Sequence, residues 1–154
     1  MDKLKSRKRL RLIGYDYSKD GAYFITICTK DRRCILSNIV GTDDYIGPKV
    51  QLTEIGRLVQ KYILQINGID SFVIMPNHIH LIIIKQSGAM WSSHPTNVSS
   101  DIRTFKTLVT KDIGESIWQS KFYDHIIRDE YDYMVHLQYI DENPAKWIED
   151  KYYK

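Results

Sequence analysis

Two short apolar runs, separated only by Pro76-Asn77, constrain the fold of this chain most strongly. The runs extend from Ser71 to Met75 and from His78 to Ile84, and both are rich in β-branched residues. Each run is too short for a typical helix and is therefore predicted to be a strand. A Pro-Asn connection leaves no room for a crossover, so the two strands are predicted to pair as an antiparallel hairpin.

Residue spacing predicts the other elements. Apolar residues recur at helical intervals from Leu52 to Ile66, with Thr53 as N-cap, and the preceding stretch Lys30 to Lys49 is expected to be loop with a short irregular element. A last helix is expected from Glu130 to Asn143. The remaining expectations are a first strand over Ala22 to Thr29, a mobile loop over Ser87 to Ser100, a helix from Ile102 that ends near Gly114, a strand over Phe122 to Ile127, and an Asp129 cap and a Pro144 stop for the last helix.

The order of these elements is strand, helix, strand, strand, helix, strand, helix. This order is typical of a split βαβ arrangement with one added helix. The predicted fold class is therefore α+β: a ferredoxin-like or RRM-like antiparallel sheet with helices on one face. An extra C-terminal helix carries Tyr139.

Composition is that of a soluble globular protein. Of the 154 residues, 43% are hydrophobic and 27% are charged. The longest apolar run, Leu81 to Ile84, is far shorter than a membrane span, and no apolar segment follows the basic N-terminus as a secretory signal would require. Cys28 and Cys34 form no CxxC pair, and two thiols without a targeting signal fit a reducing cytoplasm.

Positive charge is concentrated at the N-terminus. Residues 1–12 carry six basic side chains and one acidic one, whereas the whole chain has a net charge of only +3. The sequence is therefore divided into a basic arm, 1–12, and a single domain, 13–154. Such an arm suits a polyanion such as nucleic acid, and a solvated tail explains it equally well.

His78 and His80 are the first candidate site residues. Side chains at positions i and i+2 of a strand face the same side, so the two imidazoles are expected side by side, with Ile79 and Leu81 directed into a core. Paired imidazoles can share one metal ion. Two hydrogen-bonded surface histidines on a half-exposed strand are the structural alternative.

Tyr139 and Asn143 are the second candidate pair. They are four residues apart on the last predicted helix and therefore project from one face. A tyrosine hydroxyl can act as a nucleophile and an Asn oxygen can bind a hard metal ion. Tyr131, Val135 and Tyr139 also fall on one stripe, so Tyr139 can alternatively be a core residue.

A third, weaker group combines cations with aromatic rings, as single-stranded nucleic-acid sites do. Trp118 can also be a core anchor in a domain of this size. The candidate DNA-binding residues are Arg7, Lys8, Arg9, Arg11, Arg103, Lys106, Trp118 and Arg128.

Taken together, these motifs resemble the single-tyrosine HUH transposases, including the REP-associated tyrosine transposases. The H-U-H motif, in which U is apolar, matches His78-Ile79-His80 after Met75-Pro76-Asn77. The segment leading into the catalytic helix resembles Ile117-Trp118-Gln119 and Phe122 to Arg128, and the end of that helix resembles Tyr139-Ile140 with Asn143-Pro144. The match extends from about Arg9 to Trp147, nearly the whole chain.

The resemblance implies a metal-dependent transposase that cleaves and rejoins single-stranded DNA at hairpin-flanked, palindromic repeats. Tyr139 would be the nucleophile that forms a 5′-phosphotyrosine, and His78, His80 and Asn143 would bind Mg²⁺ or Mn²⁺, with Asp141-Glu142 as a further ligand or a solvated edge. The implied location is cytoplasmic and nucleoid-associated, in a bacterial or archaeal cell, without a membrane partner. Relatives occur as monomers and as homodimers that share the tyrosine helix, and a homodimer is expected.

Two other functions compete with this interpretation. A non-catalytic RNA-recognition-type module has the same sheet, although an RNP1-like Lys/Arg-Gly-Phe/Tyr signature is missing here. A domesticated relative that only binds hairpins would retain all the motifs described. A histidine-triad hydrolase is excluded because Ile82 stands where that motif requires histidine.

Overall fold

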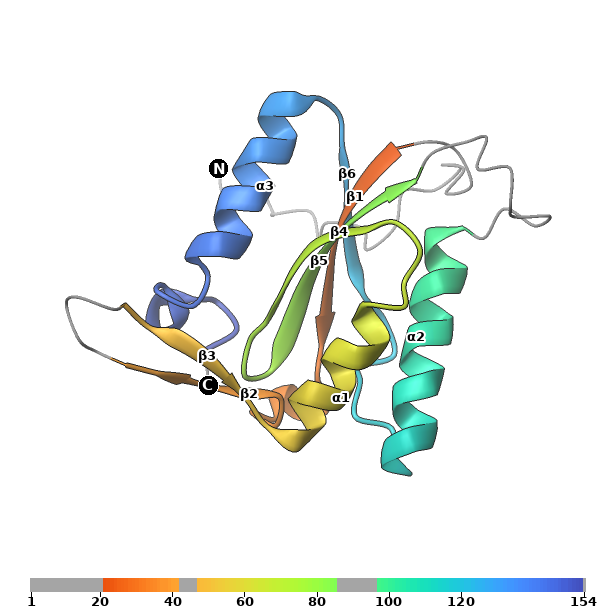
Figure 1. Cartoon of the computed structure of the whole chain (residues 1–154), viewed down its shortest axis with the longest axis vertical. Helices are drawn as coiled ribbons and strands as arrows, with labels where there is room; N and C mark the ends of the chain where they lie inside the picture. Colours follow the sequence, from red (N-terminus) through yellow and green to blue (C-terminus); the bar gives the residue numbers. More distant parts are fainter. Residues whose placement is uncertain (1–20, 42–46, 86–96, 154) are drawn as a thin grey trace, which may run out of the picture.

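The computed structural model describes residues 21–41, 47–85 and 97–153, which form an antiparallel sheet with helices on both sides (Figure 1). The strand order in the sheet is β4-β5-β1-β6, so β5 and β1 are the central strands. Every pairing is antiparallel, which confirms the predicted α+β class. The strands are β1 (Gly21–Cys28), β4 (Ile69–Ile74), β5 (His78–Lys85) and β6 (Tyr123–Ile127).

The β4–β5 hairpin forms around Pro76-Asn77, as the sequence predicts. Ile74 pairs with Ile79, and the Met75 N–H donates to the His78 carbonyl at 2.8 Å. This tight connection places His78 at the very start of β5, where the strand meets the end of β1.

The two faces of the sheet carry different cores. Tyr23, Ile25, Ile79 and Leu81 lie on one face, in a cluster that is covered by α1 (Glu54–Ile63) and α2 (Val98–Ile113). Figure 1 shows these two helices side by side. The opposite face carries Phe24 and Ile82, which pack in a second cluster with Ile140 of α3 (Glu130–Glu142). The alternation of strand side chains therefore builds three layers, and the last helix covers the face opposite α1 and α2.

The structure corrects the expectation for residues 30–49. They contain a short 3₁₀ turn, Lys30–Arg32, and a β-hairpin of β2 (Ser37–Val40) and β3 (Lys49–Leu52). Its strands have four residues each and alternate weakly, so the local pattern does not reveal them. Ile39 and Val50 pack against the second core cluster, and this tertiary contact stabilises the hairpin.

Two helix starts also differ from the prediction. Leu52 pairs with Ser37 in β3, so α1 begins at Glu54, and it ends three residues early at Ile63. α2 begins at Val98 because Asn97 caps it, its side chain accepting from the Ser100 N–H at 2.7 Å. The expected loop over 87–100 is therefore shorter, and its residues 87–96 lie outside the described part of the chain. The predicted caps Thr53 and Asp129 are confirmed.

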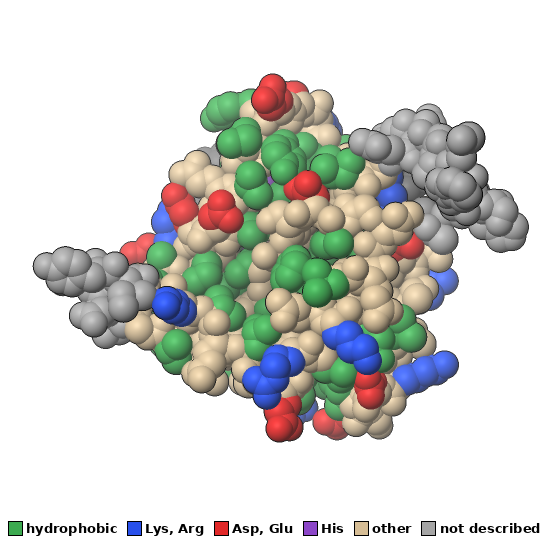
Figure 2. Space-filling view, in the orientation of Figure 1, with side chains coloured by type: hydrophobic (Ala, Val, Ile, Leu, Met, Phe, Trp, Pro, Cys, Tyr) green, Lys and Arg blue, Asp and Glu red, His purple; other side chains and the backbone are tan. Residues whose placement is uncertain are grey.

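The surface seen in Figure 2 has Lys and Arg side chains along its lower part, where α1 and α2 lie. Within the three described ranges, no helix has the length and apolar character that crossing a bilayer requires.

One close backbone contact ties β2 to α1. Gly56 is buried beneath Leu36, and a Cβ atom built at this position would lie 1.9 Å from the Leu36 carbonyl oxygen. Thr53 holds the same carbonyl by donating from Oγ1 at 2.9 Å. The entry into α1 therefore depends on a glycine at this position.

We predict that Gly56→Ala destabilises the protein by about 1–3 kcal/mol, because the backbone must move to admit the methyl group. This loss should exceed the gain from the better helix propensity of alanine, about 1 kcal/mol. Urea unfolding measures the difference. The control Lys61→Ala, on an exposed position of the same helix, should change stability by less than about 0.5 kcal/mol. Equal stability of the two variants would contradict the proposed contact.

Candidate active site

Tyr139 and Asn143 lie one turn apart at the C-terminal end of α3, as the spacing predicts. The Asn143 side-chain nitrogen donates to the Tyr139 carbonyl at 3.3 Å. The Asn143 side chain is buried, and its Oδ1 atom has no hydrogen-bond donor among the described residues. A buried carbonyl oxygen without a donor is costly and indicates a ligand site.

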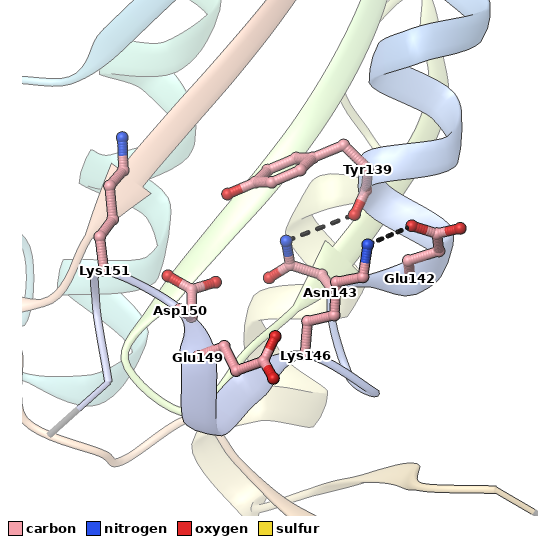
Figure 3. Close-up of a pocket in the computed structure, with 7 residues that line it drawn as sticks. All are labelled: Tyr139, Glu142, Asn143, Lys146, Glu149, Asp150 and Lys151. Atoms are coloured by element: carbon pink, nitrogen blue, oxygen red, sulfur yellow. Dashed lines mark hydrogen bonds and ion pairs between the residues drawn. The ribbon is translucent and has the colours of Figure 1, made fainter.

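The Tyr139 side chain is only partly buried. Its exposed fraction is 39%, so the alternative that Tyr139 is a core residue is wrong. The ring lines a cavity of about 300 Å³. Figure 3 shows it extending from α3, with Asn143 and Asp150 below it. A second cavity of about 260 Å³, also lined by Tyr139, includes His80. The hydroxyl therefore stands where a substrate can reach it.

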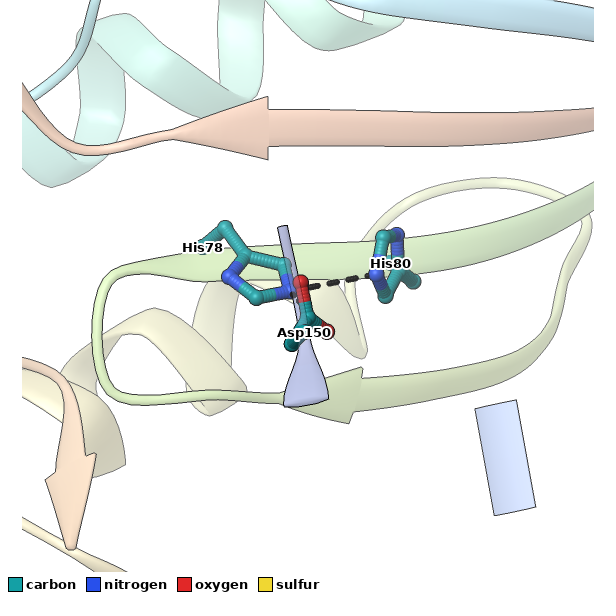
Figure 4. A group of neighbouring side chains, drawn as sticks. All are labelled: His78, His80 and Asp150. Carbon is teal, nitrogen blue, oxygen red and sulfur yellow. Dashed lines mark hydrogen bonds and ion pairs between the residues drawn. The ribbon is translucent and has the colours of Figure 1, made fainter. Parts of the chain in front are cut away.

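His78 and His80 lie on the α3 side of the sheet and point toward Asp150 (Figure 4). Their Nε2 atoms are 3.1 Å apart, and the exposed fractions are 0% and 1%. The alternative of two surface histidines is therefore wrong. The Tyr139 ring lies against the His80 ring, with centroids 5.1 Å apart.

Hydrogen bonds on the far side of each ring orient the two imidazoles. Nδ1 of His78 donates to Asn77 Oδ1 at 2.8 Å, because the Asn77 Nδ2 atom is occupied in donating to the Tyr152 carbonyl at 2.7 Å. This leaves His78 Nε2 with a lone pair. Nδ1 of His80 bonds the Thr26 hydroxyl at 2.8 Å, a partner that can donate or accept. Both rings can therefore direct Nε2 lone pairs at one point.

Burial keeps both imidazoles neutral. It lowers the pKa of His78 to about 3, against the opposing effect of the Asn143 amide. Burial lowers the pKa of His80 well below its usual value, and the neighbouring His78 adds to the effect. The pKa of the Tyr139 hydroxyl is raised by burial, and the Asn143 amide partly opposes this. The site thus holds two neutral bases and a protonated phenol at neutral pH.

Asp150 is a site residue that the sequence patterns did not predict. It follows the 3₁₀ turn Trp147–Glu149, and its Oδ2 atom lies 3.9 Å from His78 Nε2. Asp141 is exposed, and Glu142 accepts a hydrogen bond from Lys146 at 2.7 Å. The acidic neighbour of the histidines is therefore Asp150. A carboxylate beyond the helix end has no periodic signal that would mark it.

These side chains fit a divalent metal ion. Ligand atoms of His78, His80 and Asp150 all lie within 4.8 Å of one another, and the unpaired Asn143 oxygen adds a hard ligand. The two Nε2 atoms are 3.1 Å apart, so both nitrogens can reach one ion.

The predicted DNA-binding residues do not gather at one place. Arg103 is exposed on α2, and the neighbouring Lys106 donates from Nζ to the Gln119 carbonyl at 2.6 Å. Trp118 packs in the core against Phe105, so only 5% of it is exposed. Arg128 follows the last residue of β6, whereas Trp118 precedes the first. Arg7, Lys8, Arg9 and Arg11 lie outside the described residues.

His125 and His136 both contact Asp132 near the start of α3. His125 Nε2 lies 2.9 Å from the Asp132 carboxylate, and His136 Nδ1 donates to the Asp132 carbonyl at 2.8 Å. The Arg128 N–H donates to the same carboxylate at 3.1 Å. This cluster attaches the start of α3 to the end of β6 and so fixes the helix that carries Tyr139.

Comparison with known proteins identifies relatives similar over most of the chain. An uncharacterized protein of Haemophilus influenzae is 32% identical over 174 residues, covering 96% of this chain and 93% of the relative. A REP-associated tyrosine transposase of Escherichia coli is 29% identical over 140 residues, covering 86% of this chain and 72% of the relative. No protein-family model matches the chain.

Among solved structures, a REP-associated tyrosine transposase bound to a REP hairpin is similar with a TM-score of 0.65. It is 27% identical in sequence, and the match covers 88% of this chain and 73% of the solved one. The similarity therefore includes almost all the described elements.

We predict that the metal-free protein loses stability as the pH falls below about 6. The unfolded chain protonates His78 near pH 6.5, whereas the folded chain, with a pKa of about 3, does not. Unfolding then takes up a proton, and the free energy of unfolding falls by about 1.4 kcal/mol per pH unit for this residue. Urea unfolding in a chelator between pH 7 and pH 4 measures this slope. His78→Gln should flatten it, and parallel curves for the two proteins would contradict the buried neutral state.

Proposed function

The chain belongs to the family of the REP-associated tyrosine transposases, and from this membership we propose that it cleaves and rejoins single-stranded DNA through Tyr139. One observation carries the proposal. The Tyr139 ring lies 5.1 Å from the His80 ring, beside paired imidazoles and the unpaired Asn143 oxygen. A half-exposed nucleophile next to a ready metal site is the arrangement that phosphoryl transfer needs.

In the proposed cleavage step, Tyr139 Oη attacks the phosphorus of a DNA phosphodiester. The new bond is a 5′-phosphotyrosine, and the bond between phosphorus and the departing 3′ oxygen breaks. The phenol loses its proton and the 3′ oxygen gains one, so the step is balanced without ATP or water. Attack of a 3′-OH on the phosphotyrosine reverses the chemistry and joins a strand to the retained end.

We propose that His78, His80, Asn143 and Asp150 hold the metal ion, of which the sequence implied only the first three. A bound Mg²⁺ or Mn²⁺ would polarise the scissile phosphate and lower the cost of the negative charge that develops there. The two nitrogens also suit softer ions, whereas the amide and carboxylate oxygens favour Mg²⁺ or Mn²⁺. Thr26 and Asn77 hold the imidazole rings from behind.

A DNA hairpin is the proposed partner, because the similar solved transposase is bound to a REP hairpin. The basic arm, 1–12, is proposed to contact the phosphate backbone. Tyr139 and His80 of one chain are already in contact, so one chain can supply the whole site. Sharing of the tyrosine between two subunits is therefore not required for the reaction.

The binding-module alternative is less well supported. An RNA-recognition domain stacks bases on one face of a four-stranded sheet. Here the split βαβ sheet, which we infer to be ferredoxin-like, has α1 and α2 on one face and α3 on the other. The α3-covered face carries buried histidines where such a domain needs accessible aromatic rings.

We predict that Tyr139→Phe abolishes a covalent protein–DNA adduct, because the substitution removes only the nucleophilic oxygen. The assay is incubation with single-stranded DNA from the repeats that flank the gene, with Mn²⁺, followed by a denaturing protein gel. Tyr131→Phe is the matched control, since Tyr131 is on the same helix and 79% exposed. An adduct that persists in Tyr139→Phe would assign the nucleophile to another residue. Tight hairpin binding without any adduct would favour the binding module.

We predict that Asn143→Ala and Asp150→Asn each weaken Mn²⁺ binding at least about tenfold, because each removes an oxygen from the proposed ligand set. Isothermal titration with Mn²⁺ measures the affinity. Asp141→Asn is the control: it removes an exposed carboxylate of α3 with the same charge change. Equal affinities for Asp150→Asn and Asp141→Asn would remove Asp150 from the ligand set.

A further inference from the structure

A third cavity, separate from those beside Tyr139, lies between the second half of α2 and the segment 116–120. Its volume is about 310 Å³. Among the described residues, its lining has no acidic side chain, whereas it has two lysines, four hydroxyl side chains, an amide and an indole. The lining residues are Lys106, Thr107, Thr110, Lys111, Ser116, Trp118, Gln119 and Ser120. Such a lining consists mainly of cations and hydrogen-bond donors, which suits an anion.

Trp118 gives this cavity a rigid wall. Its ring packs on Phe105 with centroids 5.7 Å apart, and it is 95% buried. The buried indole Nε1 has no hydrogen-bond partner among the described residues. Lys106 links α2 to the segment 116–120 by donating to the Gln119 carbonyl. The cavity is thus built by packed side chains and not by a loose loop.

The cavity adjoins the end of the sheet that carries the candidate active site. Trp118 pairs with Thr29, and the Gln119 N–H donates to the Cys28 carbonyl at 2.9 Å. Cys28 in turn lies opposite His78 in the β1–β5 register. One strand end therefore separates the cavity from the histidine pair.

Cations extend across this strand end. Lys151 and Arg32 lie 5.0 Å and 6.0 Å from the centre of the Tyr152 ring, which covers His78. Burial raises the pKa of the Cys28 thiol to about 11, while the charges of Arg32, Lys151 and Lys106 act on it in the opposite direction. Three cations and one carboxylate, that of Asp150, therefore lie near Cys28, between the candidate active site and the cavity.

We propose that this cavity binds a phosphodiester group of the DNA molecule whose scissile phosphate is at Tyr139, with Lys111 as its main charged contact. The inference rests on the proposed function, and it adds a backbone subsite that sets where the strand runs. Its hydroxyl and ammonium donors match phosphate oxygens and do not select a base. The phosphate belongs to the single strand next to the cut or to the hairpin stem, and the chemistry is the same for both.

The test is the salt dependence of binding, measured by fluorescence anisotropy with a labelled hairpin that carries a single-stranded flank. Loss of one phosphate contact should reduce the slope of log affinity against log salt by about 0.7 for a single strand or 0.9 for a duplex. We expect this reduction, and a severalfold weaker affinity, for Lys111→Ala. Lys61→Ala, an exposed lysine of α1 that does not line the cavity, should keep the wild-type slope.

A scan of single methylphosphonate linkages, which are uncharged, should identify one linkage that abolishes the effect of Lys111→Ala. Its position in the flank or in the stem assigns the source of the phosphate. A wild-type slope in Lys111→Ala, or an effect that no linkage removes, would overturn the subsite. The adduct assay at saturating DNA separates the two proposals. If the wild-type protein forms the adduct and Lys111→Ala leaves the salt slope unchanged, only the subsite proposal fails. If Lys111→Ala reduces the salt slope but the wild-type protein forms no adduct, the subsite proposal stands and the proposed cleavage activity fails.

Discussion

The pairing of β1 with β5 is the constraint on which the rest of the structure depends. It joins the two central strands without interruption from Gly21 opposite Lys85 to Cys28 opposite His78. This register places Thr26 opposite His80, where its hydroxyl reaches the ring. A slip of one residue would move the imidazoles to the face of α1 and α2, among the apolar side chains of the first cluster.

The site contains buried polar side chains, those of His78, His80 and Asn143, and the Asn143 oxygen has no hydrogen-bond partner among the described residues. Each histidine uses Nδ1 for a neighbour in the protein, so the two Nε2 atoms face each other at 3.1 Å. Leaving a buried acceptor without a donor costs about 1–3 kcal/mol. Binding of an ion would offset this cost. Neutral imidazoles, kept so by burial, are the form that such an ion requires.

The helix that carries Tyr139 is held at both ends and by a narrow apolar face that packs on the second core cluster. At its start, Asp132 links α3 to β6 through His125 and the Arg128 backbone, and Tyr133 donates to Asp70 of β4 at 2.6 Å. At its end, Ile140 and Asn143 are buried. Between them, His136 and Leu137 are partly buried against the sheet, whereas Val135 on the outer side remains exposed. Tyr139 is therefore fixed in position and still accessible, which a nucleophile for a large polymeric substrate needs.

The sequence by itself determined what local periodicity controls. Alternation in β5 placed His78 and His80 together and opposite Ile79, and helical spacing placed Tyr139 beside Asn143. The caps at Thr53 and Asp129 could be predicted because each is a hydrogen bond between one side chain and a backbone N–H three residues later. The hairpin of β2 and β3 was not, since contacts of Ile39 and Val50 with distant residues stabilise it.

Only the tertiary structure decided which face of the sheet α3 covers, and so brought Tyr139 to His80. It also placed Asp150 beside His78 and buried Trp118. The segment 116–120 forms one wall of the third cavity, against α2. These placements depend on how layers pack across many residues of intervening chain. No short-range pattern encodes them, because their free energy comes from burial shared by whole elements and not from any one pair of neighbours.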